Sequence, residues 1–174
     1  MGRERSEGVN IRSALPLDCR RTWQWSMDPD TLANSTRGGA VKFSEHKRWF
    51  TERLRDPDTL MFMGHSQMHG LEPVGWVRYG RIKSGKPIWT GGPIAREDGP
   101  AEVSVIIAPE MRGRGYATDL LREALPPADW THRLRALILL HNTASARAFA
   151  GAGYSLVGQE TRMGKEHLVY EREL

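Results

Sequence analysis

The sequence predicts an α/β domain whose central mixed sheet has about six or seven strands and carries helices on both faces. Two apolar stretches, at 101–108 and 134–140, have the length and composition of buried strands. Each is followed by a segment whose apolar residues recur at helical spacing, at 115–125 and 144–150. Strands and helices therefore alternate in the second half of the chain, which is typical of this fold class.

The first half of the chain is expected to supply the earlier elements. These are a strand at 9–15, a helix at 17–27, a helix at 44–55, and strands at 60–65 and 73–81 around a turn near 69–70. Asp28-Pro29-Asp30 is a turn signal that ends the first helix, and Ser44 is the expected N-cap of the second. Trp49, Phe50 and Leu54 lie on the inner face of that second helix.

The second half is expected to alternate between strands and helices. Its elements are a loop at 85–100, a strand at 101–108, a helix at 115–125, a strand at 134–140, a helix at 144–150, and a closing hairpin of strands at 155–157 and 168–173. Pro126-Pro127 ends the first of these helices, and Gly151 with Gly153 ends the second. The order of elements indicates a mixed sheet.

Length and composition limit the class of protein. The chain has 174 residues, 39% of them apolar and 26% charged, which suits one domain at 9–174 behind a disordered tail at 1–8. No apolar run approaches the ~20 residues that cross a bilayer, and the first residues contain no apolar signal region. We therefore expect a cytoplasmic protein without a membrane partner. The single cysteine, Cys19, excludes an internal disulfide and is interpreted as a small buried residue.

The charge of the chain favours an anionic ligand. The formal net charge is +4 and the isoelectric point is about 9.5. The basic residues are scattered rather than gathered in one tract, so no nucleic-acid partner is expected. No metal site is predicted, and a homodimer is compatible with the sequence.

The stretch that follows the strand at 101–108 carries the clearest chemical signal. Gly113 and Gly115 precede a helix, where free N–H groups and the positive end of the helix dipole attract anions. Arg112 and Arg114 add positive charge, so the turn is suited to hold a phosphate or pyrophosphate. A Walker loop would need a Gly-Lys-Ser/Thr ending, and a dinucleotide fingerprint would place its third small residue at Thr118, which fits poorly. A plain glycine-rich turn is the alternative.

Two blocks of sequence resemble the GNAT superfamily of N-acetyltransferases. Arg112-Gly-Arg-Gly115-Tyr-Ala117 is similar to its Arg/Gln-x-x-Gly-x-Gly/Ala signature and stands between a strand and an amphipathic helix. Asn142-Thr-Ala-Ser145-Ala-Arg-Ala-Phe149 with the following Gly153-Tyr154 is similar to its second block. The resemblance implies the GNAT fold and acetyl-CoA as co-substrate.

The resemblance also implies roles for particular residues. Acetyl-CoA would be held by the turn residues Arg112, Gly113, Arg114, Gly115, Ala117 and Thr118, by the strand backbone at Val105 and Ile107, and by Asn142 and Ser145 along the pantetheine arm. The N–H of Ile107 would polarise the thioester carbonyl as an oxyanion donor, which makes it a catalytic group. Asn142 and Ser145 would equally suit a strand end and a helix N-cap, and the two roles are compatible.

The acid and the base of the reaction are less defined. Many family members place a tyrosine acid where this chain has Phe149, so the acid lies elsewhere or the thiolate leaves unassisted. Glu102 and Ser104 share one face of an otherwise apolar strand. Glu102 is therefore the candidate catalytic base, acting directly or through water, and a surface charge at the start of the strand is the alternative.

The N-terminal half resembles one subgroup of the superfamily, the acetyltransferases of nucleotide-linked amino sugars in pseudaminic-acid and related pathways. The similarity lies in the segments at 28–36, 43–50 and 75–78, and the chain departs from the subgroup at Leu32, where arginine is usual. By this resemblance His46, Trp49 and Arg78 are candidate contacts to the sugar and its diphosphate. The alternative for His46 and Trp49 is packing of the helix on the sheet.

Together these patterns predict an enzyme that moves acetyl from acetyl-CoA to a primary amine, with a nucleotide-linked amino sugar as the leading acceptor. A protein N-terminus or a small amine metabolite is the second acceptor class. A CoA-binding sensor without catalysis is a third hypothesis, which Phe149 makes conceivable, and turnover of acetyl-CoA would separate it from the other two.

Overall fold

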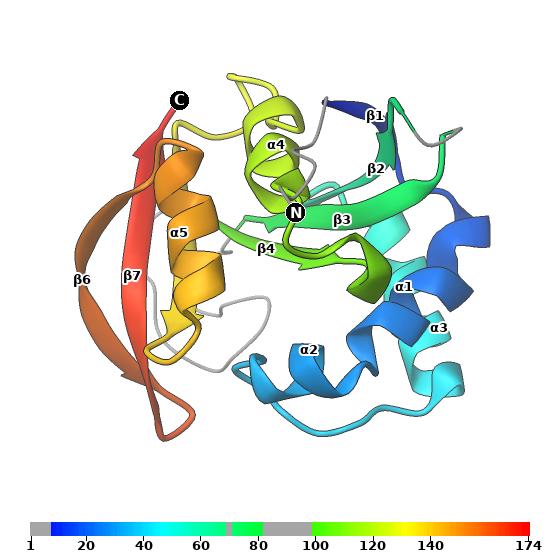
Figure 1. Cartoon of the computed structure of the whole chain (residues 1–174), viewed down its shortest axis with the longest axis horizontal. Coiled ribbons are helices and arrows are strands. Elements are labelled where there is room, and N and C mark those ends of the chain that lie inside the picture. The colour runs from blue at the N-terminus through cyan, green and yellow to red at the C-terminus, as the bar shows by residue number, and fades with distance from the viewer. Residues whose placement is uncertain (1–7, 69–70, 82–98) are drawn as a thin grey trace, which may run out of the picture.

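The computed structural model describes residues 8–68, 71–81 and 99–174, and Figure 1 shows a single seven-stranded sheet with helices packed against it. The strands are β1 (Val9–Ser13), β2 (Thr59–Ser66), β3 (Pro73–Gly80), β4 (Ala101–Ile107), β5 (Arg133–Leu139), β6 (Ser155–Arg162) and β7 (Lys165–Glu173). The helices are α1 (Cys19–Ser26), α2 (Pro29–Ala33), α3 (Phe43–Arg55), α4 (Tyr116–Glu123) and α5 (Thr143–Gly151), with 3-10 turns at Pro16–Asp18 and Pro109–Met111.

The sheet is mixed, with strand order β1-β2-β3-β4-β5-β7-β6. Strands β1 to β4 are antiparallel neighbours, β4 and β5 are parallel, and β7 lies antiparallel between β5 and the edge strand β6. The connection from β4 to β5 runs through α4, as a parallel pair requires. The predicted fold class is therefore confirmed.

The two faces of the sheet are covered by different helices. A Cβ at Gly64 of β2 would lie 2.1 Å from Leu120 Cδ1, so α4 packs closely on the face to which Gly64 points. On the other face, the Trp49 ring of α3 lies 6.3 Å from the Trp76 ring of β3. Antiparallel register places Arg78 and Ser104 on the same face as Trp76. Glu102, two residues before Ser104 on β4, points to this second face, which is called the Glu102 face below.

Three elements differ from the sequence prediction. Residues 29–33 form the short helix α2, because Asp28 caps Thr31 N and Pro29 occupies the first helical position, where its missing N–H costs nothing. Helix α3 begins at Phe43 with Lys42 as N-cap, so Ser44 lies inside it. The closing hairpin is longer than predicted, because positive φ at Met163 and Gly164 makes a tight turn between β6 and β7.

The remaining elements agree with the prediction to within a few residues. Phe50 on the inner face of α3 is fully buried, and Leu120 and Leu121 of α4 are buried as the helical spacing indicated. Cys19 is buried. The tail at 1–7, the turn at 69–70 and most of the loop at 85–100 lie outside the described residues.

Candidate active site

A wedge between β4 and β5 is the central feature of the site. These two parallel strands pair only at their beginnings, where Ala101 lies opposite Leu134 and Glu102 opposite Arg135. Beyond Glu102, β4 continues to Ile107 and β5 to Leu139 without pairing to one another. The strands therefore diverge toward their carboxyl ends, where an open α/β sheet commonly binds its ligand.

The backbone of β4 presents unpaired groups to this wedge. Ala108 N donates to Val74 O at 2.9 Å, which fixes the hydrogen-bonded positions between β3 and β4. Because bonded and non-bonded pairs alternate along an antiparallel ladder, Val105 and Ile107 occupy non-bonded positions. Their N–H and C=O groups point away from β3 and toward the wedge. An extended arm with amide groups, such as pantetheine, could pair with them.

The glycine turn lies at the open end of the wedge, between β4 and α4. Gly113 has φ 75° and Gly115 has φ 96°, so both occupy the left-handed region that disfavours side chains. Gly115 is the N-cap of α4, and no side chain caps that helix. Within the described residues, the N–H groups of Tyr116 and Ala117 have no acceptor. This arrangement of free N–H groups at a helix start suits a phosphate.

The two arginines of the turn have different surroundings. Arg112 is held by α2, since its Nη2 donates to Asp28 Oδ2 at 2.5 Å and to Thr31 Oγ1 at 2.8 Å. Burial alone would raise the pKa of Asp28, but hydrogen bonds from Arg112 and Thr31 lower it below its ordinary value. Arg114 has no ion-pair partner among the described residues and is half-buried beside the turn.

The second predicted block lies at the start of α5, close to the end of β5. Asn142 accepts a hydrogen bond from Ser145 N at 3.1 Å and is the N-cap of α5. Thr118 of α4 faces α5, with its Oγ1 3.5 Å from Ala148 O. Phe149 is buried and packs edge-on against Tyr154 at 5.0 Å between ring centroids. Thr118 therefore links α4 to α5, and Phe149 packs α5 against the residue that precedes β6.

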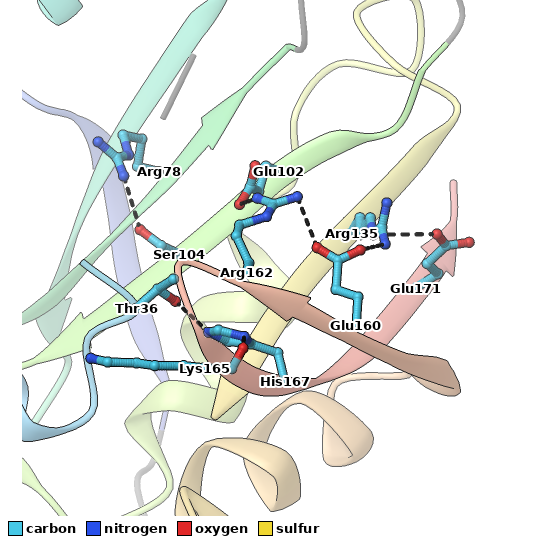
Figure 2. A network of polar contacts seen from close by, with 10 residues as sticks. All are labelled: Thr36, Arg78, Glu102, Ser104, Arg135, Glu160, Arg162, Lys165, His167 and Glu171. Atoms are coloured by element: carbon cyan, nitrogen blue, oxygen red, sulfur yellow. Dashed lines mark hydrogen bonds and ion pairs between the residues drawn. The ribbon is translucent and has the colours of Figure 1, made fainter. Parts of the chain in front are cut away.

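A chain of charged side chains occupies the Glu102 face, as Figure 2 shows. Glu102 Oε1 accepts from Arg162 Nη1 at 2.9 Å, and Arg162 Nη2 lies 3.0 Å from Glu160. Glu160 also binds Arg135, whose Nε is 3.9 Å from Glu171. Glu102 Oε2 is buried without a hydrogen-bond partner among the described residues. Glu102 therefore has one carboxylate oxygen fixed by Arg162 and one left to accept a proton.

The three predicted acceptor contacts lie together beside this chain of charges. Arg78 is buried over the Trp49 ring at 4.8 Å, and the ring centroids of His46 and Trp49 are 5.3 Å apart. Arg78 Nη2 also reaches Ser104 Oγ at 3.4 Å.

His46 is buried, and its Nε2 lies 3.2 Å from Thr22 Oγ1, which fits a packing role. Burial lowers the pKa of His46 to about 4, so it is neutral at pH 7. A direct role for His46 and Trp49 in acceptor binding stays a prediction.

The β6–β7 hairpin supplies site residues that the sequence analysis missed. Arg162 and Glu160 come from β6, and His167 and Lys165 come from β7. His167 is fully buried, with Nε2 2.9 Å from Thr36 Oγ1, and Lys165 Nζ donates to Ser35 O at 3.1 Å. Burial lowers the pKa of His167. The period-two spacing of Glu160 and Arg162 was the available signal, but it lay beyond the predicted end of that strand.

Comparisons with known proteins bear on this geometry. The sequence model of one family, described as Acetyltransferase (GNAT) domain, matches residues 9–155. The solved structure of AAC(6')-Ib in complex with paromomycin and acetyl-CoA is similar, with a TM-score of 0.76 at 14% identity over 96% of this chain and 94% of that one. Spermidine N-acetyltransferase from Vibrio cholerae in complex with CoA and spermine has a TM-score of 0.74 at 15% identity over 97% of this chain and 96% of that one. No curated protein sequence matches the chain significantly.

Two further properties concern only the described ranges. None of the helices there has the length and apolar character that a bilayer crossing requires. No group of three or more His, Cys, Asp or Glu side chains in these ranges is arranged to hold a metal ion.

Proposed function

The chain belongs to the acetyltransferase (GNAT) domain family and is an acetyl-CoA-dependent N-acetyltransferase, and from this premise we propose that its acceptor is a small primary amine that also carries an anionic group. A nucleotide-linked amino sugar is the leading example of such an acceptor. The diverging strands β4 and β5 and the glycine turn before α4 support acetyl-CoA as the co-substrate, because they offer unpaired backbone groups to an amide arm and a pyrophosphate.

The charge balance on the Glu102 face is the observation that carries the acceptor proposal. Among the residues drawn in Figure 2, four cationic side chains (Arg78, Arg135, Arg162 and Lys165) stand beside three carboxylates (Glu102, Glu160 and Glu171). A polyamine acceptor would need an excess of carboxylates to hold its several ammonium groups. An acceptor with one amine and a compensating negative charge fits this balance better.

Lys165 is the cation of this face best suited to the negative group. Its Nζ is bonded to the Ser35 carbonyl and has no carboxylate within ion-pair distance among the described residues. Arg135 and Arg162 are already neutralised by Glu160 and Glu102. We therefore assign the anionic part of the acceptor to the neighbourhood of Lys165, and we assign to Glu102 the proton that the acceptor amine loses.

In the reaction that follows from this assignment, the acceptor amine loses its proton before it attacks the thioester carbon. Glu102 lies five residues before Ile107 on β4, roughly 16 Å away at ~3.3 Å per residue, so its free oxygen would take that proton through a chain of water molecules. The Ile107 N–H, which points into the wedge, would donate to the carbonyl oxygen as negative charge develops on it. The C–N bond forms, the C–S bond breaks and CoA leaves as the thiolate, which is a tolerable leaving group because thiols are comparatively acidic. The nitrogen then gives its second proton to the thiolate or to water, which leaves the neutral amide.

An acceptor panel with acetyl-CoA tests the proposal by the rate of thiol release. The panel contains an amino sugar with and without its nucleotide diphosphate, spermidine, and a peptide with a free N-terminus. We expect the nucleotide-linked sugar to give the highest kcat/KM, and Lys165→Met to raise its KM without affecting the bare amino sugar. A preference for spermidine would overturn the assignment of an anionic acceptor.

A further inference from the structure

The segment at 28–36, called the bridging segment, is attached at both ends to the sides of the wedge. At one end, Arg112 from the turn after β4 binds Asp28 and Thr31. At the other end, Thr36 binds His167, and Ser35 O accepts from Lys165. His167 lies opposite Leu139, the last residue of β5. The bridging segment therefore connects the carboxyl ends of the two diverging strands, and Figure 1 shows α2 lying between α1 and the β6–β7 hairpin.

The Arg112 guanidinium is directed toward α2. Its Nη2 donates to Asp28 and Thr31, and its Nη1 lies 3.3 Å from Asp30 Oδ2. Arginine offers its donors in a rigid planar fork, so a guanidinium engaged with one carboxylate cannot turn its fork to a phosphate without losing those bonds. The free N–H groups of the glycine turn, by contrast, have no partner among the described residues.

The contact with Asp28 is stronger than the contact with Asp30. The Asp28 side chain is 18% exposed and the bond is charge-assisted, whereas the Asp30 side chain is 83% exposed. Water screens exposed ion pairs so well that most contribute little. Asp28 also accepts from Thr31 N, so the same carboxylate begins α2 and anchors it to Arg112.

We propose that Arg112 is a positioning residue for the acceptor, which holds the bridging segment across the open end of the wedge through Asp28. This inference rests on the proposed function, because it assumes that the amine reaches the thioester at that open end. Arg112 then contributes little to acetyl-CoA affinity, for which the backbone N–H groups of the turn suffice. Loss of the Arg112–Asp28 contact frees the bridging segment and weakens binding of the acceptor.

Three variants and one control test this role. Arg112→Gln removes the charge. Asp28→Asn removes the other charge but keeps a good N-cap for α2, and the double variant completes the cycle. Asp30→Asn is the matched control, because it removes an exposed carboxylate from the same helix. Acetyl-CoA affinity is measured by calorimetry, acceptor KM and kcat by thiol release, and the mobility of the bridging segment by hydrogen exchange of the amides at 31–36.

We expect Arg112→Gln and Asp28→Asn each to raise acceptor KM by about 5- to 10-fold, because each removes a half-buried, charge-assisted pair. Acetyl-CoA affinity should stay within about twofold of wild type. The double variant should be no worse than either single one, since both remove the same contact. Exchange at 31–36 should accelerate in all three variants and stay unchanged in Asp30→Asn.

Other results would overturn the role of Arg112. A tenfold loss of acetyl-CoA affinity in Arg112→Gln, with Asp28→Asn unaffected, would make Arg112 a phosphate ligand. An equal rise of acceptor KM in Asp30→Asn would show that the general charge of α2 matters rather than this contact. Failure of the proposed function has a different signature, which is a higher kcat/KM of wild type for spermidine than for the nucleotide-linked sugar, and the exchange measurement still reports the Arg112–Asp28 contact in that case.

Discussion

Arg162 Nη1 lies 2.9 Å from Glu102 Oε1, although two strands, β5 and β7, separate the strands that carry these residues in the sheet. The β6–β7 hairpin must therefore curl over the Glu102 face, and Figure 2 shows the Arg162 side chain beside Glu102. Both side chains are largely buried, at 11% and 15% exposed. The hairpin thus fixes the candidate base from the opposite side of the wedge.

Removal of Arg162 should destabilise the fold because it leaves the largely buried carboxylate of Glu102 without its ion-pair partner. We expect Arg162→Met to lower the free energy of unfolding by about 2–3 kcal/mol, since Glu102 and Glu160 would repel each other in a poorly solvated place. Urea unfolding measures this loss. The control is Arg133→Met, whose partner Glu171 is 4.0 Å away and whose side chain is 43% exposed, and we expect it to cost less than about 0.5 kcal/mol. Equal losses in the two variants would contradict the buried pairing.

The glycine turn should be intolerant of side chains where acetyl-CoA approaches it. Gly115→Val is expected to abolish acetyl-CoA binding while the domain stays folded, because a branched side chain at the N-cap of α4 would occupy the place of the pyrophosphate. Calorimetry with acetyl-CoA measures the loss.

The matched control for that variant carries the same backbone strain elsewhere. Gly164 in the β6–β7 turn has φ 72° and Gly115 has φ 96°, so both positions disfavour a side chain. No heavy atom lies close to the place where a Cβ at Gly164 would be. Gly164→Val should therefore lose similar stability but keep its acetyl-CoA affinity. Unchanged affinity in a folded Gly115→Val protein would remove the turn from the cofactor site.

Burial of His46 makes the stability of the fold depend on pH. The pKa of His46 is about 4 in the folded protein against an ordinary value of 6.5, because burial disfavours the charged ring. Between these two values the unfolded chain binds a proton that the folded protein does not. Above pH 6.5, His46 therefore costs the fold no stability through protonation. As the pH decreases from 6.5 toward 4, the free energy of unfolding falls.

We expect His46→Gln to remove part of this dependence, on the order of 2 kcal/mol between pH 7 and pH 4.5. Urea midpoints at the two pH values measure it, and the exposed His132→Gln is the control. His65 and His167 also have pKa values lowered by burial, so some dependence should persist in the variant. Equal slopes in wild type and His46→Gln would mean that the pKa of His46 is the same in the folded and unfolded protein.

The sequence predicted best where one local pattern determines the structure. The apolar strand at 101–107, the glycines at 113 and 115, and the amphipathic helix α4 form a contiguous unit, so this strand–turn–helix arrangement was predicted without tertiary information.

The sequence predicted least where polar groups meet across the fold. The strand β6 continues to Arg162, but its inward residues there are charged, so the alternation of apolar and polar residues that marks a strand is lost. Asp28-Pro29 was interpreted as a turn, although an aspartate before a proline also begins a helix. The partners of Glu102 and Arg112 lie 60 and 84 residues away in the chain, a separation that no local pattern reveals.

Glu102 is the residue on which the proposed chemistry depends most. The acceptor amine is largely protonated near neutral pH, so it must lose a proton before it attacks the thioester. Glu102 Oε2 has no partner among the described residues, whereas Oε1 is held by Arg162. Glu102→Gln keeps the shape of the side chain and removes the base. We expect acetyl-CoA affinity to stay within a few-fold and kcat/KM to fall by roughly 10²-fold at pH 7, the low end for loss of a general base.

The pH dependence of that loss separates a base from a binding group. As the pH rises, more amine arrives already deprotonated, so the deficit of Glu102→Gln should shrink if Glu102 acts as the base. Glu160→Gln is the control, because it removes the other carboxylate that binds Arg162 without touching β4, and we expect no pH-dependent deficit from it. A uniform deficit of Glu102→Gln at every pH would assign Glu102 to acceptor binding, and wild-type kcat/KM at pH 7 would exclude it from the mechanism.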